Sequence, residues 1–174
     1  MGTNGSTMLK PLRQGPPPTD PARVSSSASC SLAARHEAVR GARRFTRSTL
    51  TDWELDERFD DIALVVSELV TNALRHALPA EPPLDYQDPP IRLHLMCWPG
   101  RLVCAVRDPS PSSPGSFFAA LAGEDARAFP DPGRGTAESG RGLLLVDSFS
   151  DNWGWYPLAG ALHGKVVWAL FRLG

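Results

Sequence analysis

The chain has 174 residues, which leaves room for one folded domain and a tail but excludes an assembly of several domains. Its 18 basic and 19 acidic side chains give a net charge of −1, so no overall field favours nucleic acid as a direct partner. The three cysteines lack the spacing of a disulfide framework or a zinc site, and every apolar run is far shorter than the ~20 residues that cross a membrane. We therefore expect a cytoplasmic protein without a membrane span.

The first 30 residues are rich in Gly, Pro, Ser and Thr and offer little apolar surface to offset the entropy of ordering them. They predict a disordered N-terminal tail over residues 1–30, followed by a folded domain over residues 31–174. The end of the tail, near residues 24–31, could still join the edge of a sheet, because Ser and Val tolerate extended backbone.

Two helices are predicted next in the chain. After Ser31, which is suited to be an N-cap, residues recur at steps of three and four and predict a first helix. A stronger apolar stripe runs from Ile62 to Ala77 at alternating steps of three and one. It predicts an amphipathic helix that lies on a core and ends before Pro79.

The segments that follow predict a β-hairpin and a long loop. Residues 91–97 and 101–107 alternate between apolar and other side chains on either side of a Pro-Gly turn, as expected of two antiparallel strands. Residues 108–138 are rich in Pro, Ser and Gly, which is unusual for a connection inside a compact domain. We expect this segment to be a lid or to be disordered.

The C-terminal part predicts a glycine-opened helix over residues 140–149 and two strands over residues 151–156 and 165–172. Together the elements predict an α+β fold, a two-layer sandwich in which helices cover one face of a mostly antiparallel sheet.

Three polar residues, Glu68, Asn72 and His76, are spaced four apart and therefore stack on one line of the second helix. The line borders the apolar stripe beside Val65 and Leu69, where a polar side chain faces a partly desolvated crevice and needs a partner. A ligand or a metal ion in a cleft would supply that partner. The alternative is an ordinary exposed Glu with an Asn tolerated in mid-helix, and for His76 a packed histidine.

Asp108 stands where the second hairpin strand ends, a position from which a carboxylate can accept hydrogen bonds from a heterocycle held under the loop. The alternative is a turn residue before Pro109. Two glycines, Gly140 and Gly142, open the helix after the loop, where backbone N–H groups and the positive helix end favour phosphate. An ordinary flexible helix entry is the alternative for these glycines.

In this order, the segments resemble the Bergerat-type ATP-binding (GHKL) fold shared by gyrase, Hsp90, histidine kinases and MutL, over residues 31–172. The likeness is strongest to its small bacterial branch of anti-sigma-factor serine/threonine kinases. Residues 65–77, VVSELVTNALRHA, are similar to the N box of that branch, and residues 106–111, VRDPSP, to its first nucleotide box. The second box and the closing strand have counterparts at residues 139–146 with Trp153-Gly154, and at residues 164–169.

The resemblance implies a role for each candidate residue. Glu68 would be the general base, and Asn72 would hold Mg²⁺ through its carbonyl oxygen. Asp108 would hold the adenine amino group, while Gly140 and Gly142 would bring backbone N–H groups to the phosphates of ATP. The resemblance also implies a sigma factor and an anti-anti-sigma antagonist protein as partners, and a homodimer.

The chain departs from the wider family after the adenine strand, where Asp-x-Gly-x-Gly is usual and Asp108 is followed by Pro-Ser-Pro-Ser. A loop without those glycines is stiffer near the base, so we expect nucleotide affinity to be weak or to depend on a partner. Two functions stay open: a Mg·ATP-dependent serine/threonine kinase that phosphorylates the antagonist, or a module that binds ATP and sequesters a partner without turnover. A histidine kinase fragment is disfavoured, because the short segment before the N box cannot supply a dimerising hairpin, and His36 is then a surface or packing residue.

Overall fold

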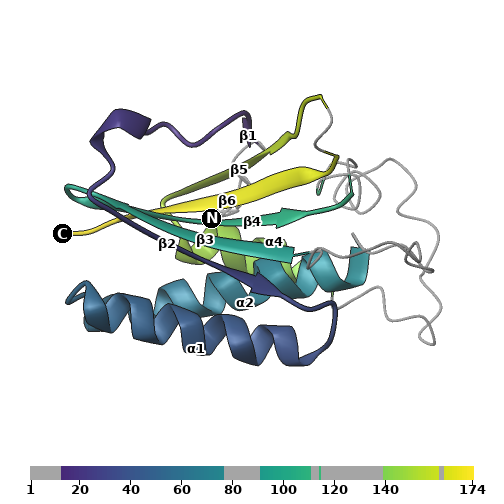
Figure 1. Ribbon diagram of the computed structural model, residues 1–174, viewed down its shortest axis with the longest axis horizontal. Coiled ribbons are helices and arrows are strands. Elements are labelled where there is room, and N and C mark those ends of the chain that lie inside the picture. Colours follow the sequence, from purple (N-terminus) through teal and green to yellow (C-terminus); the bar gives the residue numbers. More distant parts are fainter. Residues whose placement is uncertain (1–12, 77–90, 111–113, 115–138, 161–162) are drawn as a thin grey trace, which may run out of the picture.

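The computed structural model describes residues 13–76, 91–110, 114, 139–160 and 163–174 (Figure 1). Within these ranges the chain forms strands that belong to one sheet and helices that make up one layer against it. The elements are β1 (Arg13–Gln14), η1 (Pro21–Arg23), β2 (Ser26–Leu32), α1 (Glu37–Asp52), η2 (Asp56–Arg58), α2 (Phe59–His76), β3 (Ile91–Trp98), β4 (Arg101–Asp108), α4 (Ser139–Phe149), β5 (Asn152–Pro157) and β6 (Lys165–Arg172).

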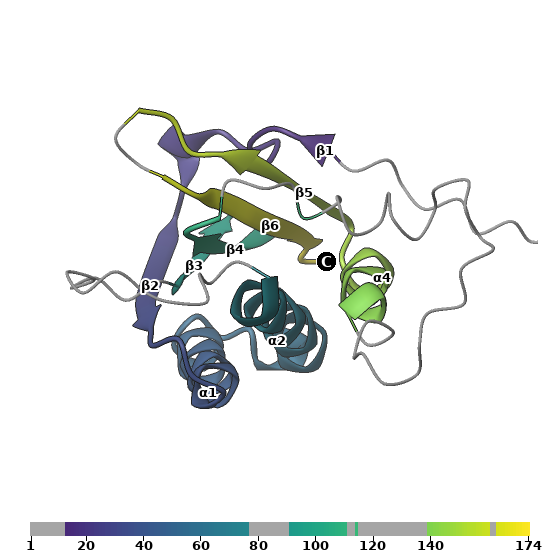
Figure 2. The same ribbon diagram turned by 90° about the vertical axis from the view of Figure 1, so that its right-hand side faces the viewer.

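The strands make one six-stranded sheet in the order β1-β5-β6-β4-β3-β2. β1 runs parallel to β5, and every other neighbouring pair is antiparallel. Figure 2 shows α1, α2 and α4 side by side on one face of this sheet. The predicted α+β fold, with helices on one face of a mostly antiparallel sheet, is confirmed.

The predicted tail over residues 1–30 is wrong for residues 13–30, whereas the alternative that residues 24–31 join the edge of a sheet agrees with β2, an edge strand. Residues 13–30 form β1, η1 and most of β2, and β2 pairs with β3 from Ser26 to Leu32. Backbone pairing and contacts beneath the chain supply the stabilisation that the polar composition lacks. For the same reason Ser31 is a strand residue and no N-cap, and α1 begins at Glu37. Residues 1–12 lie outside the described residues, as does most of the predicted loop over 108–138.

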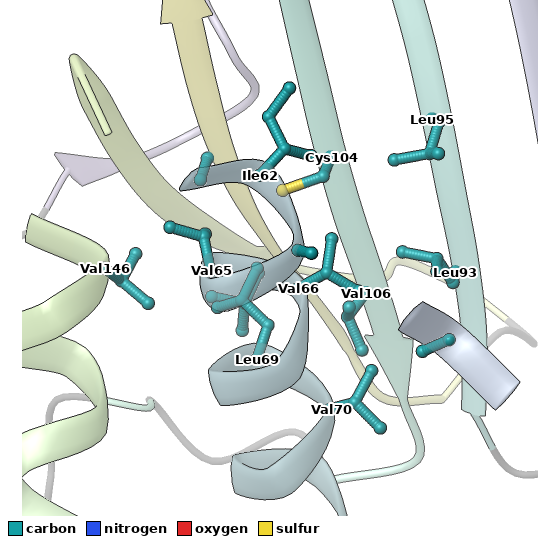
Figure 3. Packing of buried hydrophobic residues seen from close by; sticks show 14 of the residues in the cluster. Ile62, Val65, Val66, Leu69, Val70, Leu93, Leu95, Cys104, Val106 and Val146 are labelled. Carbon is teal, nitrogen blue, oxygen red and sulfur yellow. The ribbon is translucent and has the colours of Figure 1, made fainter. Parts of the chain in front are cut away.

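α2 lies on the sheet through the apolar stripe that the sequence predicts. The side chains at its centre are almost completely buried and meet β3 and β4 on one side and α4 on the other (Figure 3). This packing fixes the rotation of α2, so that the polar line beside the stripe must face α4. The cluster includes Ile62, Val65, Val66, Leu69, Val70, Leu93, Leu95, Cys104, Val106 and Val146.

The opposite face of the sheet has its own apolar cluster, which contains Trp98 and Trp168. Residues 13–25, here called the N-terminal strap, run along this face (Figure 1). The Trp98 indole Nε1 donates to the carbonyl of Asp20 at 2.7 Å, and the Trp168 Nε1 donates to the carbonyl of Gly15 at 2.8 Å. The strap is thus held by two buried indole groups whose N–H would otherwise lack a partner.

Candidate functional site

Glu68 and Asn72 lie one turn apart on α2, and both are half-buried where α4 packs against it. Gly142 in the first turns of α4 faces them directly. A Cβ atom at this position would lie 2.8 Å from Glu68 Oε2 and 3.4 Å from Asn72 Oδ1. The glycine therefore lets the helix backbone approach an acid and an amide that any larger residue would displace. The structure brings these three predicted site residues together.

The Asn72 amide has an unsatisfied group. Its Nδ2 is buried, and among the described residues nothing accepts its hydrogen bonds. Leaving a buried amide unpaired costs about 1–3 kcal/mol, so such a group points to a ligand. A half-turn of the amide exchanges its carbonyl oxygen and NH₂ group, and the site can therefore present either an oxygen to a hard cation or a donor to a phosphate oxygen. The residues present fit the Mg²⁺ and phosphate that the resemblance implies.

The Glu68 carboxyl is placed in a setting that weakens its acidity. Partial burial raises its pKa above the ordinary value, and the positive charge of Arg75 offsets part of this rise. A carboxylate with a raised pKa is a better proton acceptor near neutral pH. The raised pKa of Glu68 therefore suits a general base that accepts a proton from an attacking hydroxyl.

Asp108 closes β4 and is only 3% exposed. Its Oδ1 accepts hydrogen bonds from Lys165 Nζ at 2.9 Å and from the backbone N–H of Ser110 at 2.9 Å. Burial raises the pKa of this carboxyl, and the ammonium of Lys165 lowers it. We take the carboxylate to be ionised, because the bond to a cation stabilises the charge that burial disfavours. Asp108 is thus both a turn residue, through Ser110, and one half of a buried ion pair.

The backbone beside Asp108 is held in place by Gly164. This residue has φ +114°, and a Cβ atom there would lie 2.1 Å from the carbonyl oxygen of Asp108. The close approach sets the register in which Asp108 of β4 is opposite Lys165 of β6. Lys165 was not among the predicted site residues, although it falls in the segment that resembles the closing strand. Only the pairing of β4 with β6 shows that it meets Asp108.

Asp108 and Lys165 lie on the helix-covered face of the sheet. Side chains alternate along a strand, and Val106 and Val167, each two residues from the pair, belong to the cluster beneath the helices. The end of β4, the start of β6 and the C-terminal end of α2 also lie at the same end of the molecule, on the right in Figure 1. The ion pair therefore shares one face and one end of the domain with the polar residues of α2.

The remaining candidates have simpler positions. Gly140 lies in the first turn of α4, as the sequence predicts, but the side chains of His76 and Arg141 lie outside the described part of the chain. His36 precedes α1 with 96% of its side chain exposed, which makes it a surface residue. Within the described ranges no group of three His, Cys, Asp or Glu residues could hold a metal ion. No described helix is long and apolar enough to span a bilayer.

Comparison with solved structures supports the fold. The RsbU and RsbW domains of Rv1364c from Mycobacterium tuberculosis superpose with a TM-score of 0.56 at 18% identity, over 86% of this chain and 33% of the other. A chain of the SiaB-SiaC complex from Pseudomonas aeruginosa superposes with a TM-score of 0.50 at 14% identity, over 86% of this chain and 90% of the other. This chain therefore spans about a third of the length of the first of these two proteins.

Sequence comparison identifies the family. No curated protein matches the chain. Residues 32–169, most of the chain, match the histidine kinase-like ATPase domain family. The match includes the polar residues of α2, the end of β4, the start of α4 and the beginning of β6. The chain belongs to the histidine kinase-like ATPase domain family.

Proposed function

We propose that the chain is a Mg·ATP-dependent protein kinase of the anti-sigma-factor type, which phosphorylates a serine or threonine of an antagonist protein. The observation that carries this proposal is the contact of Gly142 with Glu68 and Asn72, because it places an acid, an unpaired amide and a helix N-terminus at one point. These are the groups that phosphoryl transfer needs for a base, a cation and phosphate oxygens.

Each residue has a distinct task in this proposal. Glu68 accepts the proton of the attacking hydroxyl and orients it. Asn72 would hold Mg²⁺ through its side-chain oxygen, and the cation would supply positive charge against the phosphates. The backbone N–H groups of Gly140 and Gly142 bind phosphate oxygens at the positive end of α4. Asp108 binds the amino group of adenine from the floor of the site.

The proposed partners are a sigma factor and an antagonist protein, and the proposed assembly is a homodimer. Support comes from the likeness of the N-box segment to the anti-sigma-factor kinases and from the fold shared with the RsbU–RsbW and SiaB–SiaC structures. The polar site and the family's ATPase character support the cofactors ATP and Mg²⁺.

A second function is favoured by one observation. The Asp108 carboxylate is already paired with Lys165, and the glycines usual after it are replaced by Ser110 and Ser112, with Pro109 and Pro111 beside them. Both features make the part of the site that would bind adenine stiffer. A stiff adenine-binding region is sufficient for a module that binds ATP weakly and sequesters its partner without turnover.

Titration calorimetry with ATP and Mg²⁺ tests the nucleotide site. We expect magnesium-dependent binding to wild type and a loss of at least about tenfold in affinity for Asn72→Ala, which removes the side-chain oxygen proposed to hold the cation. Asn152→Ala in β5 is the matched control and should bind as wild type. Absence of binding to wild type would exclude both functions.

Transfer of the γ-phosphate to the antagonist separates the two functions. A kinase transfers phosphate and loses this transfer in Glu68→Ala, whereas the exposed acid Glu57 can be replaced by Ala without effect. ATP binding without transfer would favour the sequestering module.

A further inference from the structure

The ion pair between Lys165 and Asp108 is the most deeply buried pair of opposite charges among the described residues. Lys165 Nζ lies 2.9 Å from Asp108 Oδ1, and the two side chains are 6% and 3% exposed. Lysine is rarely buried to this degree unless its charge has a specific partner. The pair also lies where the base of ATP is proposed to bind, which gives it a role to consider beyond joining β4 and β6.

The hydrogen bonds of the pair leave one donor next to one acceptor. An ammonium has three N–H groups, and Lys165 uses one on Asp108 Oδ1 and one on the carbonyl of Ser110 at 3.3 Å. Asp108 receives both of its hydrogen bonds on Oδ1. Within the part of the chain that the structure describes, nothing donates to Oδ2 and nothing accepts the third N–H of Lys165.

A donor beside an acceptor is complementary to the edge of adenine. Adenine carries the N6 amino group, which donates, next to the ring nitrogen N1, which accepts. Asp108 Oδ2 can accept from N6 while the third N–H of Lys165 is donated to N1. Guanine has the reverse order at the same two positions, a carbonyl acceptor and an N1–H donor, so it would place like groups against each other.

We propose that Lys165 is a specificity-determining residue of the base site, where it donates a hydrogen bond to N1 of adenine while Asp108 accepts from the amino group. This proposal rests on the proposed ATP-binding function. It assigns to a side chain of this protein a contact that the glycine-poor loop after Asp108 is poorly suited to make through its backbone, since Pro109 and Pro111 have no N–H group.

The test compares ATP with 1-deaza-ATP, in which a C–H group replaces N1 and the amino group is kept. We expect wild type with Mg²⁺ to bind ATP about 10- to 100-fold more tightly in titration calorimetry, the range for one hydrogen bond to a charged group. Lys165→Met should bind the two nucleotides equally. Arg172→Met, which removes an exposed cation from the other end of β6, should keep the wild-type ratio.

The measurement distinguishes failure of this proposal from failure of the proposed function. If wild type binds ATP and 1-deaza-ATP equally, or if Lys165→Met keeps the wild-type ratio, Lys165 does not contact N1 and the proposal is overturned while ATP binding stands. If wild type binds neither nucleotide, the proposed function fails and this proposal fails with it.

A second variant guards against misfolding. Lys165→Met leaves the Asp108 charge buried without its partner, a change that is strongly destabilising in proteins. The double variant Asp108→Asn/Lys165→Met removes both charges and keeps an amide that can bind the adenine amino group. Its ratio of affinities for ATP and 1-deaza-ATP should be about 1, and a ratio equal to that of wild type would overturn the proposal. The comparison in wild type needs no variant at all.

Discussion

Gly142 decides how closely α4 approaches the polar residues of α2. The space that a Cβ atom would need is taken by Glu68 Oε2 on one side and Asn72 Oδ1 on the other. The far end of a glutamate side chain is flexible and can move, so a larger residue here would disturb the site more than the fold. Gly41 in α1 offers a contrast, because a Cβ atom there would meet only Leu32 Cδ2 at 3.6 Å, an ordinary contact.

The variant Gly142→Ala is predicted to lose nucleotide affinity by about tenfold or more, about 1.4 kcal/mol, because its Cβ atom would displace the Glu68 and Asn72 side chains. Its midpoint of thermal unfolding should change little. Gly41→Ala is the matched control, and we expect it to stabilise the helix by about 0.5–1 kcal/mol with unchanged affinity. Calorimetric titration and thermal unfolding of both variants provide the check. Equal affinities in the two variants would contradict the prediction.

The raised pKa of Glu68 predicts two effects of pH. Phosphate transfer should increase with pH as the carboxyl loses its proton, with a midpoint above the ordinary value of 4.5, and Glu68→Gln should lower the rate by about 100-fold or more. An acid whose pKa is raised by folding stabilises the fold only below its unfolded pKa, and this contribution is lost as pH rises through the folded pKa. Glu68→Gln should therefore be more stable than wild type at neutral pH.

The stability difference between these two proteins should shrink as pH falls and vanish below about 4.5, the ordinary value. Urea unfolding at several pH values measures it. A wild type that is the more stable protein at neutral pH would show that the carboxylate makes a stabilising contact instead. The exposed Glu57→Gln controls for the loss of one negative charge.

At the scale of elements, the N-terminal strap is held to the sheet by side chains from three strands, β3, β4 and β6. Besides the two tryptophans, Arg101 donates to the carbonyl of Pro18 at 3.2 Å. The strap itself contributes one short strand and one turn of 3-10 helix, which have little stability of their own. Its position therefore depends on these hydrogen bonds, on the backbone bonds that β1 and Ser25 make to β5 and β3, and on the apolar surface beneath it.

The variant Trp168→Phe is predicted to release the beginning of the strap. It removes the donor to Gly15 and should cost about 1 kcal/mol in the free energy of unfolding, with faster tryptic cleavage within residues 13–23. Trp155→Phe in β5 trims a buried ring that makes no described indole hydrogen bond to the strap, so it should leave this cleavage rate unchanged. Limited proteolysis under native conditions compares them. Cleavage at the wild-type rate in Trp168→Phe would refute the role of this bond.

At the scale of the molecule, the sheet has two covered faces, one beneath the helices and one beneath the strap. The second face contains Val103, Ala105, Val166 and Leu170 in addition to the two tryptophans, all less than 10% exposed. An apolar surface of this kind promotes association between molecules when it is exposed to water.

Deletion of residues 1–25 is predicted to expose this outer cluster. The shortened chain should bind a hydrophobic dye and elute as a larger species in size-exclusion chromatography, because apolar patches of this kind drive association. Deletion of residues 1–12 alone is the control and should leave both measurements unchanged. A monomeric, dye-free product of the longer deletion would contradict the covering role of the strap.

Much of the architecture could be predicted because its signals are local. The apolar period of α2, the hairpin of β3 and β4 and the glycines of α4 can be read from neighbouring residues, and Glu68 and Asn72 follow from helical spacing. The sequence indicates that residues 24–31 can join a sheet edge, but the order of the preceding residues 13–23 could not be predicted, because it depends on contacts with strands more than 70 positions away. The Asp108–Lys165 pair was missed for the same reason, since its members are 57 residues apart. The roles of the site residues stay predictions.

The close approach of Gly164 to the carbonyl of Asp108 has a consequence for the tolerance of this protein to random change. A position in a turn between two strands is ordinarily among the most permissive in a domain. Here both the backbone angle and the absence of a side chain are required, so substitutions at residue 164 should be depleted as strongly as those in the interior. In a saturation library selected for folded protein, position 164 should tolerate only glycine, whereas its neighbours Gly160 and His163 should tolerate other amino acids.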